Sequence, residues 1–195
     1  MNQTLDYYNR NAASFNKDTV NVEFGQTQSL FLEYLEGEKI LDFGCGSGRD
    51  SKYFLEQGYD VTACDGSIEM VKLASAYTGL EVKHMLFSEL REDSVYDGIW
   101  ACSSILHCTY DELTNVFVRM LCAIHVGGVI YTSFKYGDFE GMKNERYFID
   151  FNEAKLDQFL SQFNCVKVEK EWITSDVRPG RQDEKWLNVI IRRIK

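Results

Sequence analysis

A glycine-rich run, Asp42-Phe43-Gly44-Cys45-Gly46-Ser47-Gly48, carries the strongest chemical signal in the chain. Glycines at this spacing let the backbone approach a ligand closely, and they aim the free N–H groups of a following helix at a negatively charged group. Arg49 stands where a dinucleotide-binding turn would place its third glycine, and no Gly-Lys-Ser or Gly-Lys-Thr follows. The spacing therefore argues against an NAD site and excludes a P-loop. The structural alternative is a tight turn that binds no ligand.

A single carboxylate, Asp65, ends the next apolar stretch, 17 positions after Gly48. A carboxylate at a strand end beside the glycine run can accept hydrogen bonds from both hydroxyls of a ribose. By itself, an aspartate at such a place is more often a turn former or a cap. Combined with the glycine run, Asp65 predicts a nucleoside ligand whose acidic end faces the glycines.

These residues can form one site only if the fold brings two strand ends together, and the pattern of apolar residues predicts such a fold. Short apolar runs alternate with stretches of helical periodicity, which is typical of a doubly wound α/β sheet. Helices are predicted twice in the first 35 residues, over 49–57, and after N-caps at Ser67, Thr109 and Asn152. Strands are predicted at 39–43, 59–64, 80–85, 96–102, 129–134, 166–173 and 185–191. The polar connection over 175–184 indicates an antiparallel hairpin between the last two strands.

The segment Ile40–Gly48, followed by Val61–Asp65, resembles the class I S-adenosylmethionine-dependent methyltransferase family. The likeness continues through Tyr96–Trp100 and Gly127-Gly128-Val129, so that it covers roughly residues 37 to 135. Within that family, residues 46–53 and 58–61 look most like the tellurite-resistance type of small methyltransferase. This narrower likeness says little about substrate, because fold and cofactor do not fix which molecule is methylated.

The resemblance implies S-adenosylmethionine as cofactor and S-adenosylhomocysteine as product. It places Gly44, Gly46 and Gly48 at the methionine moiety, Asp42 at its amino group and Asp65 at the ribose. Where the family commonly has an acidic residue after the third strand, this sequence has Leu86-Phe87-Ser88, so backbone groups and the Phe87 ring would face the adenine. The residues expected at the cofactor are Tyr8, Asp42, Gly44, Cys45, Gly46, Gly48, Arg49, Asp65, Gly66, Met70, Leu86, Phe87, Cys102 and Ile105.

The loop after the fourth strand, Ala101–His107, faces the substrate in similar enzymes. Methyl transfer is an in-line displacement, so most of its acceleration can come from holding the acceptor atom roughly 3 Å from the methyl group and aligned with it. An amine or alcohol must also lose a proton, whereas a thiolate, carboxylate or chalcogen oxyanion arrives ready. His107 is the best-placed candidate base, with a role in orienting the loop as the alternative.

Aromatic and basic side chains near both ends of the chain are candidates for the substrate side. Tyr8, on the first predicted helix, could close over the methionine end as part of a lid, or it could simply pack against the sheet edge. Tyr136, Arg146 and Arg178 lie in predicted loops where substrates enter such folds, and guanidinium groups suit anionic substrates. The alternative for these three residues is a solvated surface.

The composition limits the partners. The 195 residues carry 21 Lys and Arg against 30 Asp and Glu, a net charge of −9 that disfavours nucleic acid as a main partner. Residues 135–195, with 12 basic and 11 acidic side chains, are nearly neutral and leave room for a small anionic substrate. Six scattered cysteines and three scattered histidines predict reduced thiols in a cytoplasm and no metal site. No stretch is predicted to be a membrane helix or a signal peptide.

Together these observations predict an α/β fold with a doubly wound, mostly parallel seven-stranded sheet whose last strand is antiparallel. The chain is expected to be one domain, with an N-terminal helical lid over 1–36, a cofactor-binding core over 37–135 and substrate-side segments over 136–195. The expected activity is methyl transfer to a small molecule. Two alternatives stay open, a methyltransferase acting on tRNA or protein and a cofactor-binding regulatory module without turnover. Both a monomer and a homodimer are compatible with the sequence.

Overall fold

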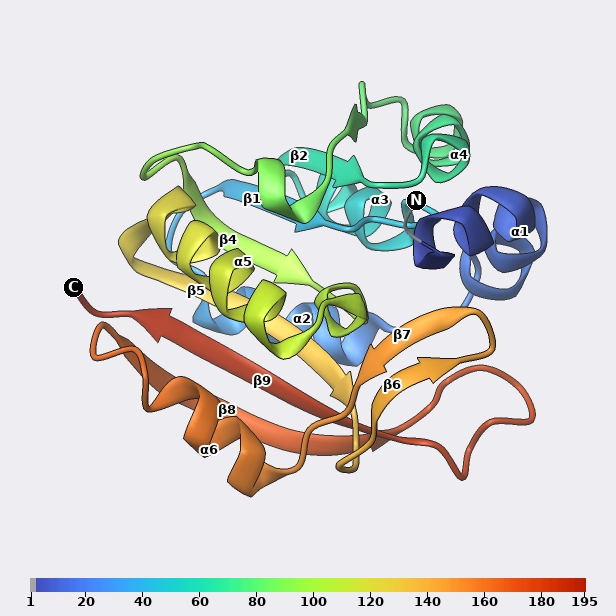
Figure 1. Ribbon diagram of the computed structural model, residues 1–195. Helices are drawn as coiled ribbons and strands as arrows, with labels where there is room; N and C mark the ends of the chain where they lie inside the picture. The colour runs from blue at the N-terminus through green and yellow to red at the C-terminus, as the bar shows by residue number, and fades with distance from the viewer. Residues whose placement is uncertain (1–2) are drawn as a thin grey trace.

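Seven strands form one twisted sheet in the order β3-β2-β1-β4-β5-β9-β8 (Figure 1). The computed structural model describes residues 3–195. Strands β1 to β5 run parallel, and β9 lies antiparallel between β5 and β8. Their bounds are β1 Lys39–Phe43, β2 Asp60–Asp65, β3 Lys83–His84, β4 Tyr96–Ala101, β5 Ile124–Lys135, β8 Val166–Ser175 and β9 Lys185–Arg193. The predicted seven-stranded, mostly parallel sheet with an antiparallel last strand is confirmed.

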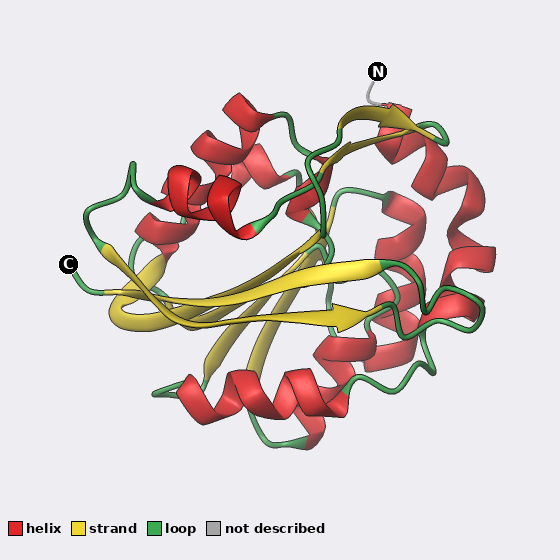
Figure 2. Ribbon diagram, turned by 90° about the horizontal axis from the view of Figure 1, so that it is seen from below, coloured by secondary structure: helices red, strands yellow, loops and turns green. Residues whose placement is uncertain are grey.

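Helices cover both faces of this sheet (Figure 2). They are α1 Gln3–Thr19, α2 Gly25–Tyr34, α3 Arg49–Glu56, α4 Ile68–Thr78, α5 Tyr110–Ala123 and α6 Glu153–Leu160, with short 3₁₀ turns η1 Phe87–Glu89 and η2 Ile105–His107. The three predicted N-caps are confirmed. The side chains of Ser67, Thr109 and Asn152 accept hydrogen bonds from backbone N–H groups in the first turns of α4, α5 and α6.

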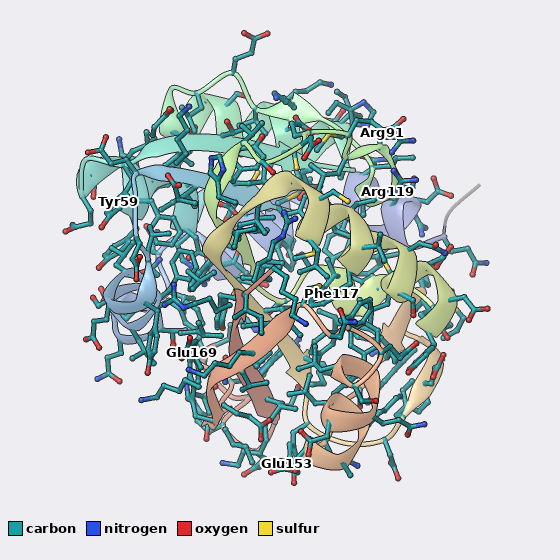
Figure 3. All side chains as sticks on the ribbon, turned by 90° about the vertical axis from the view of Figure 1, so that its left-hand side faces the viewer. Tyr59, Arg91, Phe117, Arg119, Glu153 and Glu169 are labelled. Carbon is teal, nitrogen blue, oxygen red and sulfur yellow. The ribbon has the colours of Figure 1, made fainter. Side chains whose placement is uncertain are left out.

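Aromatic side chains fill the core on both sides of the sheet. Phe117 of α5, labelled in Figure 3, packs edge-to-face against Phe159 of α6 at 5.4 Å between ring centroids. On the opposite face, Phe31 of α2 lies 5.2 Å from the Trp100 ring of β4. A Cβ on Gly98 would lie 2.7 Å from the Phe31 ring, so glycine in β4 allows α2 to pack close against the sheet.

Two strands differ from their predicted bounds by more than two residues at one end. Strand β3 is only two residues long, because Val82 packs beside α4 and its N–H donates to Ser75 Oγ at 3.2 Å instead of joining the sheet. Strand β5 begins at Ile124, before the predicted start at residue 129, because Ile124 already pairs with Tyr96 and the register shifts before the next pair.

The structure also contains a hairpin where the sequence predicts a loop, with β6 Glu140–Lys143 paired with β7 Arg146–Ile149. Its turn residues Asn144 and Glu145 have φ of 50° and 62°. Positive φ at both turn positions suits a two-residue hairpin, but the usual glycine signal for such a turn is missing from the sequence. The hairpin lies beside α1 at the carboxyl ends of the parallel strands (Figure 1).

The two N-terminal helices have different environments. Helix α1 lies beyond the carboxyl ends of β1 and β2 and packs against α4 and β7 (Figure 1). Helix α2 instead packs on the sheet through the fully buried Phe31. The part of the predicted lid that reaches the strand ends is therefore α1. Within residues 3–195, no helix combines the length and the apolar character that a membrane span requires.

Candidate cofactor and acceptor site

A cavity of about 530 Å³ opens at the carboxyl ends of the parallel strands. Its walls come from segments far apart in sequence, namely α1, the turn after β1, the end of β2, the loop after β4, the β6–β7 hairpin and the 175–184 loop. This is the edge at which doubly wound sheets bind their ligands.

The glycine turn forms one wall of the cavity. Gly44 and Gly46 have φ of 87° and 53°, a region that side chains other than glycine rarely adopt. The N–H groups of Gly44 and Cys45 each donate to the carbonyl of Cys64 at 2.9 Å, which ties the turn to β2. Gly46 lines the cavity, and a Cβ there would be in van der Waals contact with the Phe15 ring at 3.6 Å, so glycine keeps free the space beside the backbone that a side chain would fill.

Asp65 stands beside this turn with both carboxylate oxygens held by backbone N–H groups. Oδ2 accepts from Gly46 at 2.9 Å and Oδ1 accepts from Ser67 at 2.8 Å. Burial raises the pKa of Asp65, while these two hydrogen bonds act in the opposite direction. Each oxygen keeps a lone pair free, so the carboxylate can accept two further hydrogen bonds from a ligand. Its position and remaining acceptors fit a ribose diol.

Tyr8 and His107 meet across the cavity through a hydrogen bond. The Tyr8 hydroxyl lies 2.8 Å from His107 Nε2, and His107 Nδ1 lies 2.6 Å from the carbonyl oxygen of Tyr147. Because a carbonyl can only accept, Nδ1 carries the proton and donates it to Tyr147, so that Nε2 accepts from the Tyr8 hydroxyl. Both ring nitrogens of His107 are therefore occupied.

Arg146 lies next to this pair, at the start of β7. Its guanidinium carbon is 4.3 Å from the Tyr7 ring centroid and 5.1 Å from that of Phe148. One terminal nitrogen lies 3.5 Å from the Tyr8 hydroxyl, and Nε is buried without a hydrogen-bond partner. Aromatic faces stabilise the cation here, but they leave its hydrogen-bonding capacity largely unused.

One protein family and several related proteins match this chain, and they agree with a ligand site at the carboxyl ends of the strands. Residues 40–128 match the family described as "Methyltransferase domain". Residues 40–128 form a methyltransferase domain. The malonyl-[acyl-carrier protein] O-methyltransferase of Salmonella typhimurium is 26% identical over 182 residues, which are 82% of this chain and 70% of that protein.

Solved structures share the fold of the methyltransferase. The Burkholderia thailandensis 1,6-didemethyltoxoflavin-N1-methyltransferase, with S-adenosylhomocysteine bound, aligns with a TM-score of 0.76 and 22% identity over 98% of this chain and 85% of that one. The magnesium protoporphyrin IX methyltransferase of Synechocystis, with S-adenosylmethionine bound, aligns with a TM-score of 0.72 and 16% identity over 96% and 94%. At these identities the likeness establishes the fold alone.

Most residues expected at the cofactor line the cavity of the methyltransferase. These are Tyr8, Gly44, Cys45, Gly46, Arg49, Asp65, Gly66, Met70, Leu86, Phe87 and Cys102, together with His107, Arg146 and Arg178 from the catalytic and substrate sets. Arg49 is already bound to Asp50 through two hydrogen bonds of 2.7 and 2.9 Å. Its guanidinium also lies 4.6 Å from the Phe24 ring centroid, so packing and ion pairing occupy it.

Four of the expected residues do not line the cavity. Asp42 lies buried behind the glycine turn, where its carboxyl accepts from Ser51 Oγ at 2.5 Å and burial raises its pKa. Ile105 is fully buried in the core. Tyr136 is 40% exposed, and its hydroxyl donates to Glu153 at 2.9 Å. These positions correct the sequence-based placement of all three side chains.

Gly48 is the fourth such residue. It stands at the N-cap of α3 with a φ of 80°, and a Cβ there would lie 2.9 Å from Thr78 Cγ2 and 3.2 Å from the Cβ of Ala74. Thr78 and Ala74 belong to α4. Glycine at this position therefore serves the close packing of α3 on α4 and does not open the turn to the cofactor.

The structure adds two cavity residues that the sequence does not predict. Asp176 and Trp186 line the cavity at the 175–184 loop. Asp176 is 4% exposed, and it accepts from Arg178 Nε at 2.9 Å and from Trp186 Nε1 at 3.1 Å. A carboxylate two positions before an arginine in a polar loop was the available signal for this contact. Trp186 of β9, the other partner of Asp176, lies ten positions further along the chain, and no sequence pattern predicts this contact.

The environment of His107 predicts how stability depends on pH. Burial lowers the pKa of His107 to about 4, and the charges of Arg146 and Lys135 lower it further, against the opposing hydrogen bond to Tyr147. An unfolded histidine has a pKa near 6.5, so the unfolded chain binds a proton between about pH 6.5 and 4 that the folded chain does not. The stabilisation is thus complete above pH 6.5 and is lost as the pH falls toward 4.

We expect His107→Gln to weaken this dependence, since glutamine cannot take up the proton. The melting temperature of the wild type should fall more between pH 7.5 and pH 5 than that of the variant, measured by thermal denaturation. Equal falls in both proteins would show that His107 does not titrate in this way.

Proposed function

We propose that the methyltransferase holds S-adenosylmethionine along the glycine turn, with the ribose on Asp65 and the methionine end toward Tyr8. The position of Gly46 in the cavity wall and the free acceptors of Asp65 support this placement. Gly66 and Phe87 line the same wall and would border the nucleoside. Bound there, the cofactor supplies a methyl group on a positively charged sulfur.

The same proposal places the methyl acceptor between α1, the β6–β7 hairpin and the loop after β4. Tyr8, His107 and Arg146 meet there and line the same cavity as Asp65. This convergence on one cavity is the observation that carries the proposal. A cavity of about 530 Å³ suits the cofactor together with a small molecule. Helix α1 and the hairpin would exclude water from the reaction.

The substrates named for related proteins support a small or flexible acceptor. The Salmonella relative is named for a malonyl group on a carrier protein, and the Burkholderia structure contains 1,6-didemethyltoxoflavin. Residues 46–53 and 58–61 also resemble the tellurite-resistance type of small methyltransferase, which adds chalcogen oxyanions to the candidate acceptors.

A homocysteine-release screen tests this function. Purified protein with S-adenosylmethionine is incubated with small thiols, amines, carboxylates and chalcogen oxyanions, and with a tRNA pool as the macromolecular comparison. We expect turnover with one class of small molecule and none with tRNA. Turnover with tRNA alone would contradict the small-molecule assignment. Tight cofactor binding without turnover on any acceptor would favour a regulatory module.

A further inference from the structure

Arg146 differs from most other cations of the cavity because it has no anionic partner. Arg49 pairs with Asp50, Lys135 with Glu184, and Arg178 with Asp176. None of the ion pairs within residues 3–195 includes Arg146. Arg119, which also lacks a carboxylate, lies on α5 and donates to the Leu90 carbonyl at 3.3 Å. Arg146 thus remains a cation at the Tyr8 end with unused donors.

The unused donors of Arg146 imply a ligand. A guanidinium held among aromatic rings has lost much of its hydration, and a buried Nε without a partner costs free energy until an acceptor fills the site. A guanidinium presents paired N–H groups that match the two oxygens of a carboxylate. The complementary ligand is therefore a planar anion that enters beside Tyr8.

Among residues 3–195, none at this end of the cavity is a free base. His107 Nδ1 donates to Tyr147, and its Nε2 accepts from Tyr8. A proton on this ring would also sit close to the charge of Arg146, and the pKa of His107 is already lowered to about 4, chiefly by burial. His107 is therefore not free to take a proton from an acceptor such as an amine or an alcohol. An acceptor that arrives as an anion needs no base.

The carboxylates that line the cavity are also occupied. Asp50 binds Arg49, and Asp176 binds Arg178. Asp65 accepts from two backbone N–H groups, and the proposed placement of the cofactor uses its remaining lone pairs for the ribose. Glu112 accepts from the Thr109 N–H at 2.8 Å in the cap of α5. Within residues 3–195, the cavity therefore offers a cation for an anionic acceptor but no unengaged carboxylate to take a proton.

We propose that the methyl acceptor is a small carboxylic acid, bound as its carboxylate by Arg146 and methylated on a carboxylate oxygen. This inference rests on the proposed function. In the step, a lone pair of the oxygen forms the new O–CH₃ bond, and the C–S bond breaks with its electron pair staying on sulfur, which becomes neutral. No proton moves, and the product is a methyl ester. His107 acts as a positioning residue that holds the Tyr8 hydroxyl.

A binding experiment tests the role of Arg146 without turnover. Benzoate, succinate and indole-3-acetate, each with its primary amide, are titrated into the protein saturated with S-adenosylhomocysteine. We expect the wild type to bind at least one carboxylate more tightly than its amide, and Arg146→Gln to weaken that binding on the order of 10- to 100-fold. Arg146→Lys should recover part of the loss, because it restores the charge but not the paired donors.

The matched control is Arg10→Gln. Arg10 lies on α1 near the hairpin and pairs with the exposed Glu145 at 2.8 Å, outside the cavity. Its loss should change carboxylate binding less than two-fold. S-adenosylhomocysteine affinity should stay within two-fold in all three variants, which shows that they are folded and that the cofactor site is intact.

A product experiment tests the acceptor atom. Protein and S-adenosylmethionine with a tritiated methyl group are incubated with the carboxylate panel, and the product is treated with mild alkali. A methyl ester releases its label as volatile methanol, whereas an ether, an amine or a thioether retains it. Release is the expected result.

Three results would overturn the inference. They are equal binding of carboxylates and amides by the wild type, unchanged carboxylate binding in Arg146→Gln, and a labelled product that is stable to alkali. Failure to bind S-adenosylhomocysteine would instead overturn the proposed function. Turnover of a different acceptor class, with intact cofactor binding, would overturn the carboxylate inference alone.

Discussion

Replacing Asp65 by alanine should weaken S-adenosylmethionine binding by about 30- to 150-fold. The carboxylate is proposed to accept charge-assisted hydrogen bonds from the ribose, which are worth about 2–3 kcal/mol together. The substitution also frees the N–H groups of Gly46 and Ser67, which the carboxylate now holds at 2.9 and 2.8 Å. Part of the loss therefore comes from a less ordered turn. Isothermal titration calorimetry measures the change.

Asp60→Ala is the matched control for this prediction. Asp60 begins the same strand that Asp65 ends, and its side chain is exposed away from the cavity. The control should bind the cofactor as the wild type does, while thermal denaturation shows whether both variants remain folded at the temperature of the titration. Wild-type affinity in a folded Asp65→Ala protein would refute the ribose role.

Gly44→Ala should produce the second large effect, on both stability and cofactor binding. Its φ of 87° costs a residue with a Cβ about 1–2 kcal/mol. The new Cβ would also lie 2.5 Å from Ser104 Cβ, and this clash adds roughly 1–3 kcal/mol because an atom next to the backbone cannot move aside. The Ser104 hydroxyl donates to the Phe43 carbonyl at 2.7 Å, so relief of the clash would disturb the turn.

Gly58→Ala separates the backbone cost from the clash. Gly58 has a nearly equal φ of 91°, but a Cβ there would meet nothing within 4 Å. This variant should lose only about 1–2 kcal/mol, which lowers the melting temperature by roughly 2–8 °C for a chain of this size. It should bind the cofactor normally. Equal melting temperatures for the two variants would show that the contact with Ser104 is not limiting.

The parts of the site that could be predicted from sequence are local. The glycine turn and Asp65 sit at strand ends that the apolar pattern marks, and the parallel pairing of β1 with β2 brings them together. The N-caps at Ser67, Thr109 and Asn152 follow from side chains that bond to N–H groups three positions ahead. Each of these features depends on residues that are close together in the sequence, so a local pattern is enough to predict it.

The acceptor side depends on contacts between distant residues. Tyr8 is 99 positions from His107 and 138 from Arg146, and no periodicity links them. The hairpin that carries Arg146 turns at Asn144-Glu145 without a glycine, so its residues resembled a polar loop. For Gly48 the local pattern is misleading. Its spacing predicts a contact with a ligand, whereas in the structure this glycine allows α3 to pack closely on α4.

A calorimetric titration of the wild-type protein with S-adenosylhomocysteine, S-adenosylmethionine and NADH tests the cofactor assignment most directly. We expect micromolar or tighter binding of the first two, because Asp65 and Gly46 line the same cavity, and no heat of binding with NADH. Absence of binding by both sulfur cofactors, or tight binding of NADH in their place, would contradict it.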